Sequence, residues 1–270
     1  MNPIGVVICN YNKKDFVLQC VQSVLESKEK NFDIYVVDNA SSDGSAEALK
    51  KAYGNRITVI ENKENLGGSG GFNTGLRIVR DKGYSYFMCL DDDAAVDENA
   101  LSVLYHYMEE HTDTGMAGCR VYHTQMSDYI QQSGLLIDFD NCTAKTIGAD
   151  MPEDGSLPDV IECDTVATCA VMVRADTVKQ KGVGIMPEDN FIYWDDMEWG
   201  YRIKLAGYRV VTLAEAKALH QMGANTKKEN TFINYYMWRN RTNFFMRFTP
   251  EAQMEAMSVK VLGAVFDAMY

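Results

Sequence analysis

The sequence has 270 residues, of which 46% are hydrophobic and 24% are charged, a composition typical of a globular protein with one large α/β domain or two smaller ones. The formal net charge of −12 argues against binding the phosphate backbone of nucleic acid as the main function, because that function needs a basic surface. An acidic protein can still bind a phosphorylated small molecule where a metal ion mediates the contact.

Cysteines and apolar runs indicate the compartment. The seven cysteines are scattered and form no CxxC pair, which predicts buried thiols in a reducing cytoplasm. The opening MNPIGVVICNYNKK has no basic region before a long apolar stretch, so we expect no signal peptide. No uninterrupted apolar run approaches the roughly 18 residues of a membrane-spanning helix. We therefore expect a cytoplasmic protein, and any contact with the inner face of the membrane is expected to be peripheral.

Short apolar runs alternate with helical patterns in the first half of the chain. The expected strands are Ile4–Cys9, Phe32–Val37, Ile57–Ile60 and Tyr84–Leu90. The expected helices are Lys14–Glu26, Gly44–Tyr53, Phe72–Arg80 and a segment from Asp97 to His111. This alternation predicts an α/β fold with a largely parallel sheet and helices on both of its faces.

The second half of the chain is less regular. Residues 115–174 predict irregular strands with long loops, and a helix that closes near Gly207 precedes a strand at Tyr208–Leu213. An aromatic-rich helix is expected from Asn230 to Arg247, and a last helix is expected from Pro250 to Tyr270. The final segment VKVLGAVFDAMY has no polar cap, which predicts either a truncated chain or a surface that faces a partner.

Polar residues stand where three of the expected strands end. The first strand ends in Cys9-Asn10-Tyr11-Asn12, and the second ends at Asp38, just before the turn formed by residues 41–44. Ligands of open α/β sheets bind beyond the carboxyl ends of the strands, so these side chains are expected to converge on one crevice. A turn that only caps the next helix is the alternative for the second segment.

The glycine-rich segment NLGGSGGFNTGL follows the third strand. It does not fit the GxGxxG pattern, because Asn73 stands at the third glycine position, and no Gly-Lys-Ser/Thr follows as in a Walker loop. Its place before an amphipathic helix still permits the backbone to approach a ligand closely. A flexible structural loop is the alternative.

Three consecutive carboxylates follow the fourth strand in YFMCLDDDAAV, with nothing basic close by in the sequence. Asp91 and Asp93 can reach one divalent cation with oxygen ligands, while Asp92 points elsewhere. Such a cation would offset their repulsion and could bridge a diphosphate leaving group. An acidic surface turn is the alternative, but the strongly apolar strand before the triplet favours a sheet edge.

A second acidic cluster lies in NFIYWDDMEWGYRIKL, where Asp195, Asp196 and Glu198 stand between two tryptophans. Aromatic neighbours can raise the basicity of carboxylates, because desolvation disfavours the charged form, and aromatic faces also suit a sugar ring. Capping of the following helix is the alternative for one of the two aspartates. His220 lies in ALHQMG. A single histidine of this kind is more often structural than a metal ligand.

In combination, these segments resemble the inverting family-2 glycosyltransferases with the GT-A fold. VVICNYN, VVDNASSDGS, NLGGSGGFNTGL and LDDDA occur in the family's order, and WDDMEWGYR followed by ALHQMG looks most like its galactofuranosyl- and rhamnosyltransferase branch. The resemblance covers about residues 4–245. It implies a Rossmann-like, mostly parallel central sheet flanked by helices, with C-terminal helices.

The resemblance also implies a division of the chain and a set of site residues. Residues 1–248 would form the GT-A domain, with a nucleotide-binding half (1–115) and an acceptor or catalytic half (116–248), before a C-terminal helix at 249–270. Asp196 would be the general base, while Asp195 and Glu198 would position the acceptor or donor sugar. Asp91, Asp93 and His220 would hold Mn²⁺ or Mg²⁺. The implied donor-binding residues are Asn10, Tyr11, Asp38, Gly68, Gly71, Asn73, Asp91, Asp92 and Trp194, with Trp199 as the alternative to Trp194 for packing on a sugar ring.

The function implied is transfer of a sugar from a UDP- or dTDP-linked donor, such as galactofuranose or rhamnose, to a saccharide or lipid-linked acceptor in cell-surface polysaccharide synthesis. Arg239 and Arg241 could pair with donor phosphate, with an acceptor lipid phosphate, or with the acidic rim of the site. The segments that flank this core in long polymerising relatives are missing, so we expect either single addition of a sugar or a fragment of a longer protein. The alternative function is a catalytically silent module that binds nucleotide sugars.

Overall fold

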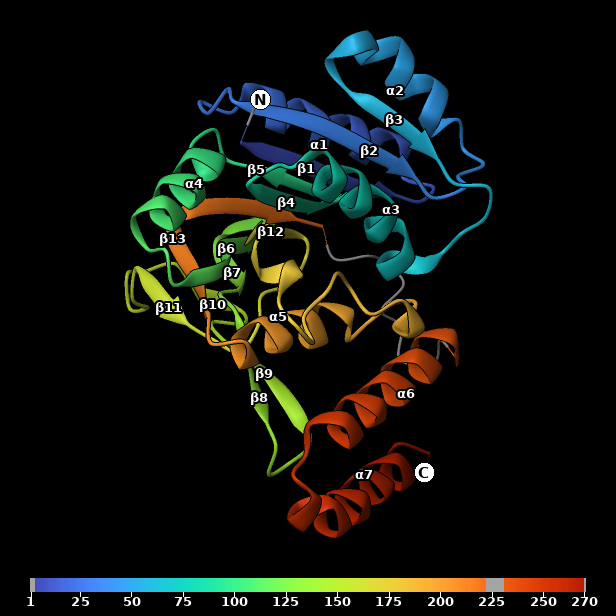
Figure 1. The fold of residues 1–270 in the computed structure, drawn as a ribbon, viewed down its shortest axis with the longest axis vertical. Helices are drawn as coiled ribbons and strands as arrows, with labels where there is room; N and C mark the ends of the chain where they lie inside the picture. Colours follow the sequence, from blue (N-terminus) through green and yellow to red (C-terminus); the bar gives the residue numbers. More distant parts are fainter. Residues whose placement is uncertain (1–2, 222–230, 270) are drawn as a thin grey trace.

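The computed structural model describes residues 3–221 and 231–269, and Figure 1 shows a central sheet with helices on its two faces. The N-terminal part contains β1 (Ile4–Asn10), α1 (Lys14–Glu26), β2 (Phe32–Asp38), α2 (Ser45–Tyr53), β3 (Thr58–Glu61), α3 (Gly67–Lys82), β4 (Tyr86–Asp91), β5 (Ala94–Val96) and α4 (Ala100–Glu110). The rest contains β6 (Thr114–His123), β7 (Met126–Gln132), β8 (Leu135–Asp138), β9 (Thr143–Thr146), β10 (Met151–Pro152), β11 (Val160–Glu162), β12 (Ala170–Arg174), α5 (Asp195–Leu205), β13 (Arg209–His220), α6 (Thr231–Phe248) and α7 (Met254–Met269). Short 3₁₀ helices lie at Gly54–Arg56, Thr177–Lys179, Glu188–Asn190 and Glu251–Gln253.

Within these described residues the main sheet has 11 strands, and its principal order is β10-β7-β6-β12-β4-β1-β2-β3. The strands β4, β1, β2 and β3 are parallel, which confirms the parallel sheet expected from the alternation of strands and helices. β12 inserts antiparallel between β4 and β6, and β13 runs parallel to β6. The sheet is therefore mixed, with its parallel part at the N-terminal end of the chain.

Alternate residues of β1 enter different hydrophobic cores, as the two-residue period of a strand requires. Val6 and Ile8 belong to the core that packs under α1, α2 and α4, whereas Val7 belongs to the core on the opposite face, with Phe72 of α3 and Trp199 of α5. All five side chains are buried. Burial on both faces explains why the strand reads as a continuous apolar run.

The glycine-rich segment is helical, which corrects the expectation of a loop before a helix at Phe72. α3 begins at Gly67 and packs closely on β1. A Cβ atom on Gly71 would lie 2.4 Å from the Cys9 sulfur, and one on Gly75 would lie 2.4 Å from Cγ1 of Val7. Glycines are needed here because the helix backbone approaches the sheet, and this requirement of packing is invisible in the local sequence.

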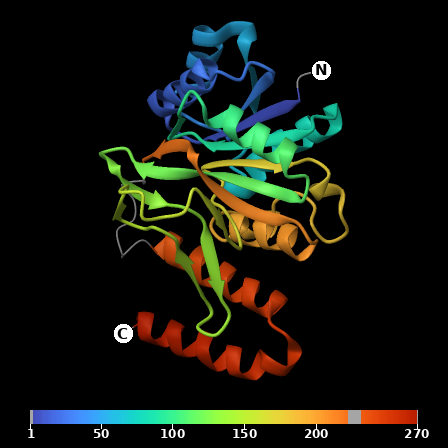
Figure 2. The ribbon, with the colours of Figure 1, turned by 90° about the vertical axis from the view of Figure 1, so that its left-hand side faces the viewer.

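A third layer lies below the sheet in Figures 1 and 2, where α6 and α7 form a helical pair and the β8–β9 hairpin reaches toward them. The hairpin and the two helices share a core that includes Trp194, Phe244 and Met257. The expected helix limits at Asn230 and Tyr270 lie outside the described residues. None of the helices in the described part of the chain is long and apolar enough to cross a membrane.

Candidate active site

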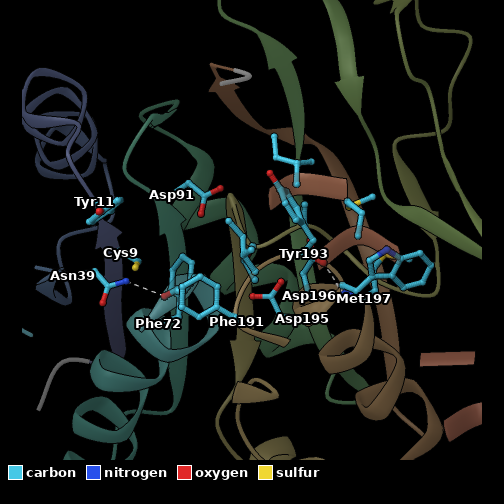
Figure 3. Close-up of a pocket in the computed structure, with 18 of the residues that line it drawn as sticks. Cys9, Tyr11, Asn39, Phe72, Asp91, Phe191, Tyr193, Asp195, Asp196 and Met197 are labelled. Carbon is cyan, nitrogen blue, oxygen red and sulfur yellow. Dashed lines mark hydrogen bonds between the residues drawn. The ribbon is translucent and has the colours of Figure 1, made fainter. Parts of the chain in front are cut away.

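A cavity of about 1020 Å³ opens beyond the carboxyl ends of β1, β2 and β4. Asn10 is paired with Asp38 and Cys9 is paired with Asp91 in the register of the three parallel strands, so the strand ends expected to converge are adjacent. Figure 3 shows Tyr11 and Asn39 near one end of the cavity, Met197 near the other, and Asp91, Asp195 and Asp196 between them. The remaining walls come from the start of α3, the segment before α5, the β8–β9 hairpin and α6.

The acidic triplet has a cationic partner that is distant in the sequence. Lys13, in the loop after β1, places its Nζ atom 3.1 Å from Asp92 Oδ1 and 2.6 Å from Asp93 Oδ2. Burial opposes the charge of Lys13, but the two carboxylates raise its pKa above the usual range. The backbone N–H of Tyr11 donates to Asp92 Oδ2 at 2.9 Å. Part of the repulsion within the triplet is therefore offset by Lys13.

Asp91, Asp93 and His220 form a group suited to a divalent cation. Each residue offers one ligand atom, and these atoms lie within 4.8 Å of one another. His220 reaches the two aspartates because β13 pairs with β5, directly after the triplet, and its Nε2 lies 3.2 Å from Asp93 Oδ1. Its Nδ1 lies 2.7 Å from Oε1 of Gln131, and because an amide oxygen only accepts, Nδ1 carries a proton. Burial opposes the charged form of His220, but in the metal-free chain the two carboxylates raise its pKa, and the charged ring can then also donate from Nε2 to Asp93.

This donor set fits a metal ion chemically. Metal-binding histidines commonly donate the N–H of the other ring nitrogen to an oxygen, which here leaves Nε2 facing the carboxylates. Two carboxylate oxygens and one imidazole nitrogen suit Mn²⁺ among the divalent ions. Burial raises the pKa of Asp91, whereas the pKa of Asp93 is lowered: burial opposes this shift, but the hydrogen bond from His220 and the charge of Lys13 outweigh it.

Asp195 and Asp196 occupy the first turn of α5 and both line the cavity. Oδ2 of Asp195 accepts a hydrogen bond from Ser69 of α3 at 2.9 Å. Oδ1 of Asp196 accepts one from the backbone N–H of Met197 at 2.7 Å. Burial raises the pKa of Asp196 to about 7, and the neighbouring charge of Asp195 adds to the rise. A carboxylate with this pKa can exchange a proton near neutral pH.

The structure divides the expected donor-binding residues into two groups. Those that line the cavity are Tyr11, Gly68, Asp91, Asp92 and Trp194. Those that lie outside its lining are Asn10, Asp38, Gly71 and Asn73. Trp194 also packs on Phe244 in the third core, so one face of its indole is occupied by the protein. Trp199, its alternative, is fully buried and donates through Nε1 to the Gly184 carbonyl, so it is unavailable to a sugar ring.

The residues outside the lining make bonds that shape the strand ends and α3. Asp38 accepts from Asn10 Nδ2 at 2.9 Å and from the backbone N–H of Ser41 at 3.0 Å, so its carboxylate holds two loops together. Asn73 bonds both the carbonyl and the N–H of Met186. Direct contacts of these residues with a donor stay a prediction. Asp38 and Asn73 use polar atoms within the protein, whereas the buried Oδ1 of Asn10 has no hydrogen-bond partner among the described residues.

Glu198 also lies outside the cavity, although we expected it to position a sugar. Its fully buried carboxylate accepts two hydrogen bonds of 2.8 Å from Nη1 of Arg247 and also pairs with Arg202. The side chain therefore ties α5 to the end of α6. A spacing of three residues predicts that Glu198 lies on the same face of α5 as Asp195. The partner Arg247 comes from another helix, so the sequence cluster could not reveal that this carboxylate is bound outside the cavity.

Several cavity residues were missed by the sequence analysis. Asn39 accepts from the N–H of Leu66 at 3.1 Å and donates to the Gly67 carbonyl at 2.9 Å, and it follows Asp38 directly. Lys13 likewise lies just beyond the polar residues noted after β1. Asn39 and Lys13 are, like their neighbours, polar residues that follow a buried strand. The sequence analysis would have included them if it had considered one more residue after each strand end. Phe191 and Tyr193 give no such signal, because they come from the loop before α5. Arg241 of α6, which the sequence analysis named as a partner for phosphate or for the acidic rim, also lines the cavity.

Gly67 is expected to be essential for the wall of the cavity. Its φ is +73° and an added Cβ would lie 2.1 Å from the Phe191 carbonyl oxygen, so Gly67→Ala should lower the free energy of unfolding by at least about 2 kcal/mol. Gly83→Ala is the matched control, because its φ is +83° but nothing lies within 4 Å of the added atom. Urea denaturation should show the larger loss for Gly67→Ala; equal losses would contradict the steric argument.

The architecture defines a class of protein. A mixed sheet of this topology, with its parallel strand ends facing a carboxylate-lined cavity, is the GT-A fold of glycosyltransferases. The structure of a mannosyltransferase from Pyrobaculum calidifontis, in complex with GDP-Man and Mn²⁺, matches with a TM-score of 0.64 and 15% sequence identity. The match covers 91% of this chain and 63% of the mannosyltransferase. The expected fold is thereby confirmed.

The chain belongs to glycosyl transferase family 2, whose sequence profile matches residues 5–168. A teichoic acid poly(glycerol phosphate) polymerase of Staphylococcus epidermidis is 26% identical over 146 residues, which are 52% of this chain and 19% of the polymerase. The glucosyltransferase WfaP of Escherichia coli, named UDP-Glc:alpha-D-GlcNAc-diphosphoundecaprenol beta-1,3-glucosyltransferase, is 30% identical over 109 residues, 40% of this chain and 42% of that enzyme. The chain thus matches less than half the length of these curated relatives.

Proposed function

We propose that this chain is the catalytic domain of a metal-dependent, inverting glycosyltransferase. It transfers a sugar from a nucleotide-sugar donor to a hydroxyl of a saccharide or lipid-linked acceptor in cell-surface polysaccharide synthesis. UDP-galactofuranose and dTDP-rhamnose are the first donors to test, because WDDMEWGYR and ALHQMG resemble that branch of the family. Both relatives described above carry names from cell-envelope glycan or polyol synthesis, which supports the class of product.

One observation supports the proposal most strongly. Asp91, at the end of β4, and Asp196, in the first turn of α5, line the same cavity from different elements. Inverting transfer needs charge stabilisation on the side of the leaving group and a base on the side of the attacking hydroxyl. Two separate carboxylate sites that face one cavity can perform these two tasks.

The leaving side is assigned to the acidic triplet. Asp91, Asp93 and His220 would hold Mn²⁺ or Mg²⁺, which when bound supplies Lewis-acid stabilisation of the diphosphate. Lys13 stands on the other side of Asp93 and keeps Asp92 oriented by their ion pair. Asp92 in turn fixes the backbone of Tyr11, which lines the nucleotide end of the cavity. The mannosyltransferase with the same fold binds both GDP-Man and Mn²⁺, which supports this assignment.

The attacking side is assigned to Asp196. Its carboxylate takes the proton of the acceptor hydroxyl while the oxygen forms a bond to the anomeric carbon. The bond from that carbon to the donor diphosphate breaks, so the products are the new glycoside, the nucleoside diphosphate and protonated Asp196. Asp195, held by Ser69 at the start of α3, would position the donor sugar between the two sides. Its negative charge also raises the pKa of Asp196 and so strengthens the base.

A donor-turnover assay tests the function. The purified chain, with Mn²⁺, is expected to release nucleoside diphosphate from at least one member of a panel of UDP-, dTDP- and GDP-sugars when saccharide acceptors are present. It should also be stabilised against heat by the same donor, since a ligand that binds only the folded state raises its stability. Tight donor binding by calorimetry, with no turnover on any acceptor or on water, would instead identify a silent nucleotide-sugar binding module.

A further inference from the structure

The far end of the cavity carries a cation that has no acidic partner in the described residues. Lys13 and Arg241 are the basic residues of the described cavity lining. Lys13 is paired with Asp92 and Asp93, whereas Arg241 forms no ion pair with any described residue. Its Nε donates to the carbonyl of Cys142, and its guanidinium lies 4.8 Å from the ring centroid of Trp238. These contacts orient the guanidinium but leave its charge uncompensated.

Arg241 belongs to the end of the cavity beyond Asp196, away from Tyr11 and Asn39. Its partner Cys142 precedes β9, where Thr143 and Ala144 also line the cavity. Ala144 packs in the third hydrophobic core with Met197, the residue next to Asp196. The acceptor hydroxyl must approach Asp196, so the space beside Arg241 is the place for the rest of the acceptor.

The surroundings of Arg241 favour binding of a permanently charged anion. Leu135, Trp194 and Met237 give this part of the cavity an apolar wall, and an ion pair is stronger where water is reduced. Carboxylates in the cavity lose part of their acidity, since burial raises the pKa of Asp195 and that of Asp196. A phosphate ester remains ionised under the same conditions, and a guanidinium matches its oxygens in geometry and charge.

On the basis of the proposed function, we infer that Arg241 binds a phosphate group of the acceptor, a short distance from the hydroxyl that Asp196 activates. The acceptor is therefore a phosphorylated saccharide or polyol rather than a neutral glycan. Two sources carry this chemistry: a sugar joined to a lipid through a diphosphate, and a soluble polyol phosphate chain. The apolar wall accommodates either the first lipid carbons or the carbon skeleton of the polyol.

Acceptor kinetics with three probes test this inference, using the donor that turns over in the panel. The probes are farnesyl-diphosphate-linked N-acetylglucosamine, a glycerol phosphate hexamer, and octyl N-acetylglucosaminide as the uncharged counterpart of the first. Arg241→Gln should raise the KM for the preferred phosphorylated probe by roughly 10- to 100-fold, the expected effect of losing a charge-assisted contact. The KM for the donor and the rate with the octyl glycoside should change by less than about threefold.

Arg241→Lys, which keeps the charge, should recover part of the affinity, and Arg80→Gln serves as the control because Arg80 pairs with Asp81 on the surface of α3. The probe whose KM responds identifies the lipid or polyol source. An equal loss with charged and uncharged acceptors, a selective rise in the donor KM, or a wild-type preference for the octyl glycoside would each overturn the inference. Absence of donor turnover with every acceptor would contradict the proposed function itself, whereas turnover without a preference for phosphate contradicts only the role of Arg241.

Discussion

Replacement of Asp196 by Asn is expected to lower kcat by roughly 10²- to 10⁴-fold, the usual contribution of a positioned general base. The amide has nearly the same size as the carboxylate but cannot take the proton of the acceptor hydroxyl. Because the leaving side remains intact, the affinity for the nucleoside diphosphate should stay within about threefold of the wild type. Steady-state kinetics for turnover and calorimetry for UDP binding measure these two effects separately.

Asp15→Asn is the matched control for this substitution. Asp15 is an exposed aspartate in the first turn of α1 and does not line the cavity, so the exchange changes the same chemistry at a helix start without altering the cavity wall. If the Asp15→Asn variant keeps the wild-type kcat, the effect of Asp196→Asn is not a general consequence of removing a negative charge from a helix N-terminus. Turnover by Asp196→Asn within about threefold of the wild type would remove Asp196 from the role of base.

The pH dependence gives a second measure of the same group. Burial raises the pKa of Asp196 to about 7, and only the deprotonated form can accept a proton. Consequently, kcat/KM should fall about tenfold for each pH unit below the pKa and should level off above it. A profile that is flat from about pH 5.5 to about pH 8 would show that another group is the base.

Removal of the metal is the second change for which we expect a large effect. Mn²⁺ at 100 times its Kd should stabilise the folded wild-type chain by about 2.7 kcal/mol, and excess EDTA should reverse this gain and abolish turnover. Asp93→Asn should eliminate the Mn²⁺-dependent rise in Tm, because it replaces one of two carboxylate ligands by a neutral amide. The ion pair between Lys13 and Asp92 remains in the variant, so the metal-free chain should still fold.

Two comparisons make the metal experiment specific. Asp128→Asn changes an exposed aspartate outside the candidate metal group, and its response to Mn²⁺ should equal that of the wild type. His220→Ala should weaken Mn²⁺ binding as well, because it removes the single imidazole of the group. A variant carrying Asp93→Asn that keeps both the full Mn²⁺ stabilisation and EDTA-sensitive turnover would refute the assignment.

The parallel half of the fold could be predicted because its signals are local. β1 is a continuous apolar run because both of its faces are buried, and α1 has one apolar stripe because only one face of it is buried. The expected limits of α1 coincide with those in the structure. β13 was predicted to end at Leu213 but continues to His220, because pairing with β5 and β6 extends it where the apolar pattern has become irregular.

The candidate site could be predicted only in part, and the division has a physical cause. Asp91 was singled out because a triplet of carboxylates follows a strongly apolar strand, and Asp196 because it lies in an acidic cluster between two tryptophans and matches the general base that the resemblance implies. Glu198 has the same local appearance, yet Arg247 lies 49 residues further along the chain and binds it outside the cavity. Likewise, Lys13 neutralises carboxylates that lie about 80 residues away.

The sequence by itself determined the family, the alternation of strands and helices, and the two acidic segments on which the chemistry is proposed to depend. These properties follow from residue type and spacing, which act over one strand or one helical turn. Only the tertiary structure decided which polar groups face the cavity and which are used up inside the protein. That choice depends on the partner each group meets after folding, such as Asn10 for Asp38 or Met186 for Asn73, and those partners come from distant parts of the chain.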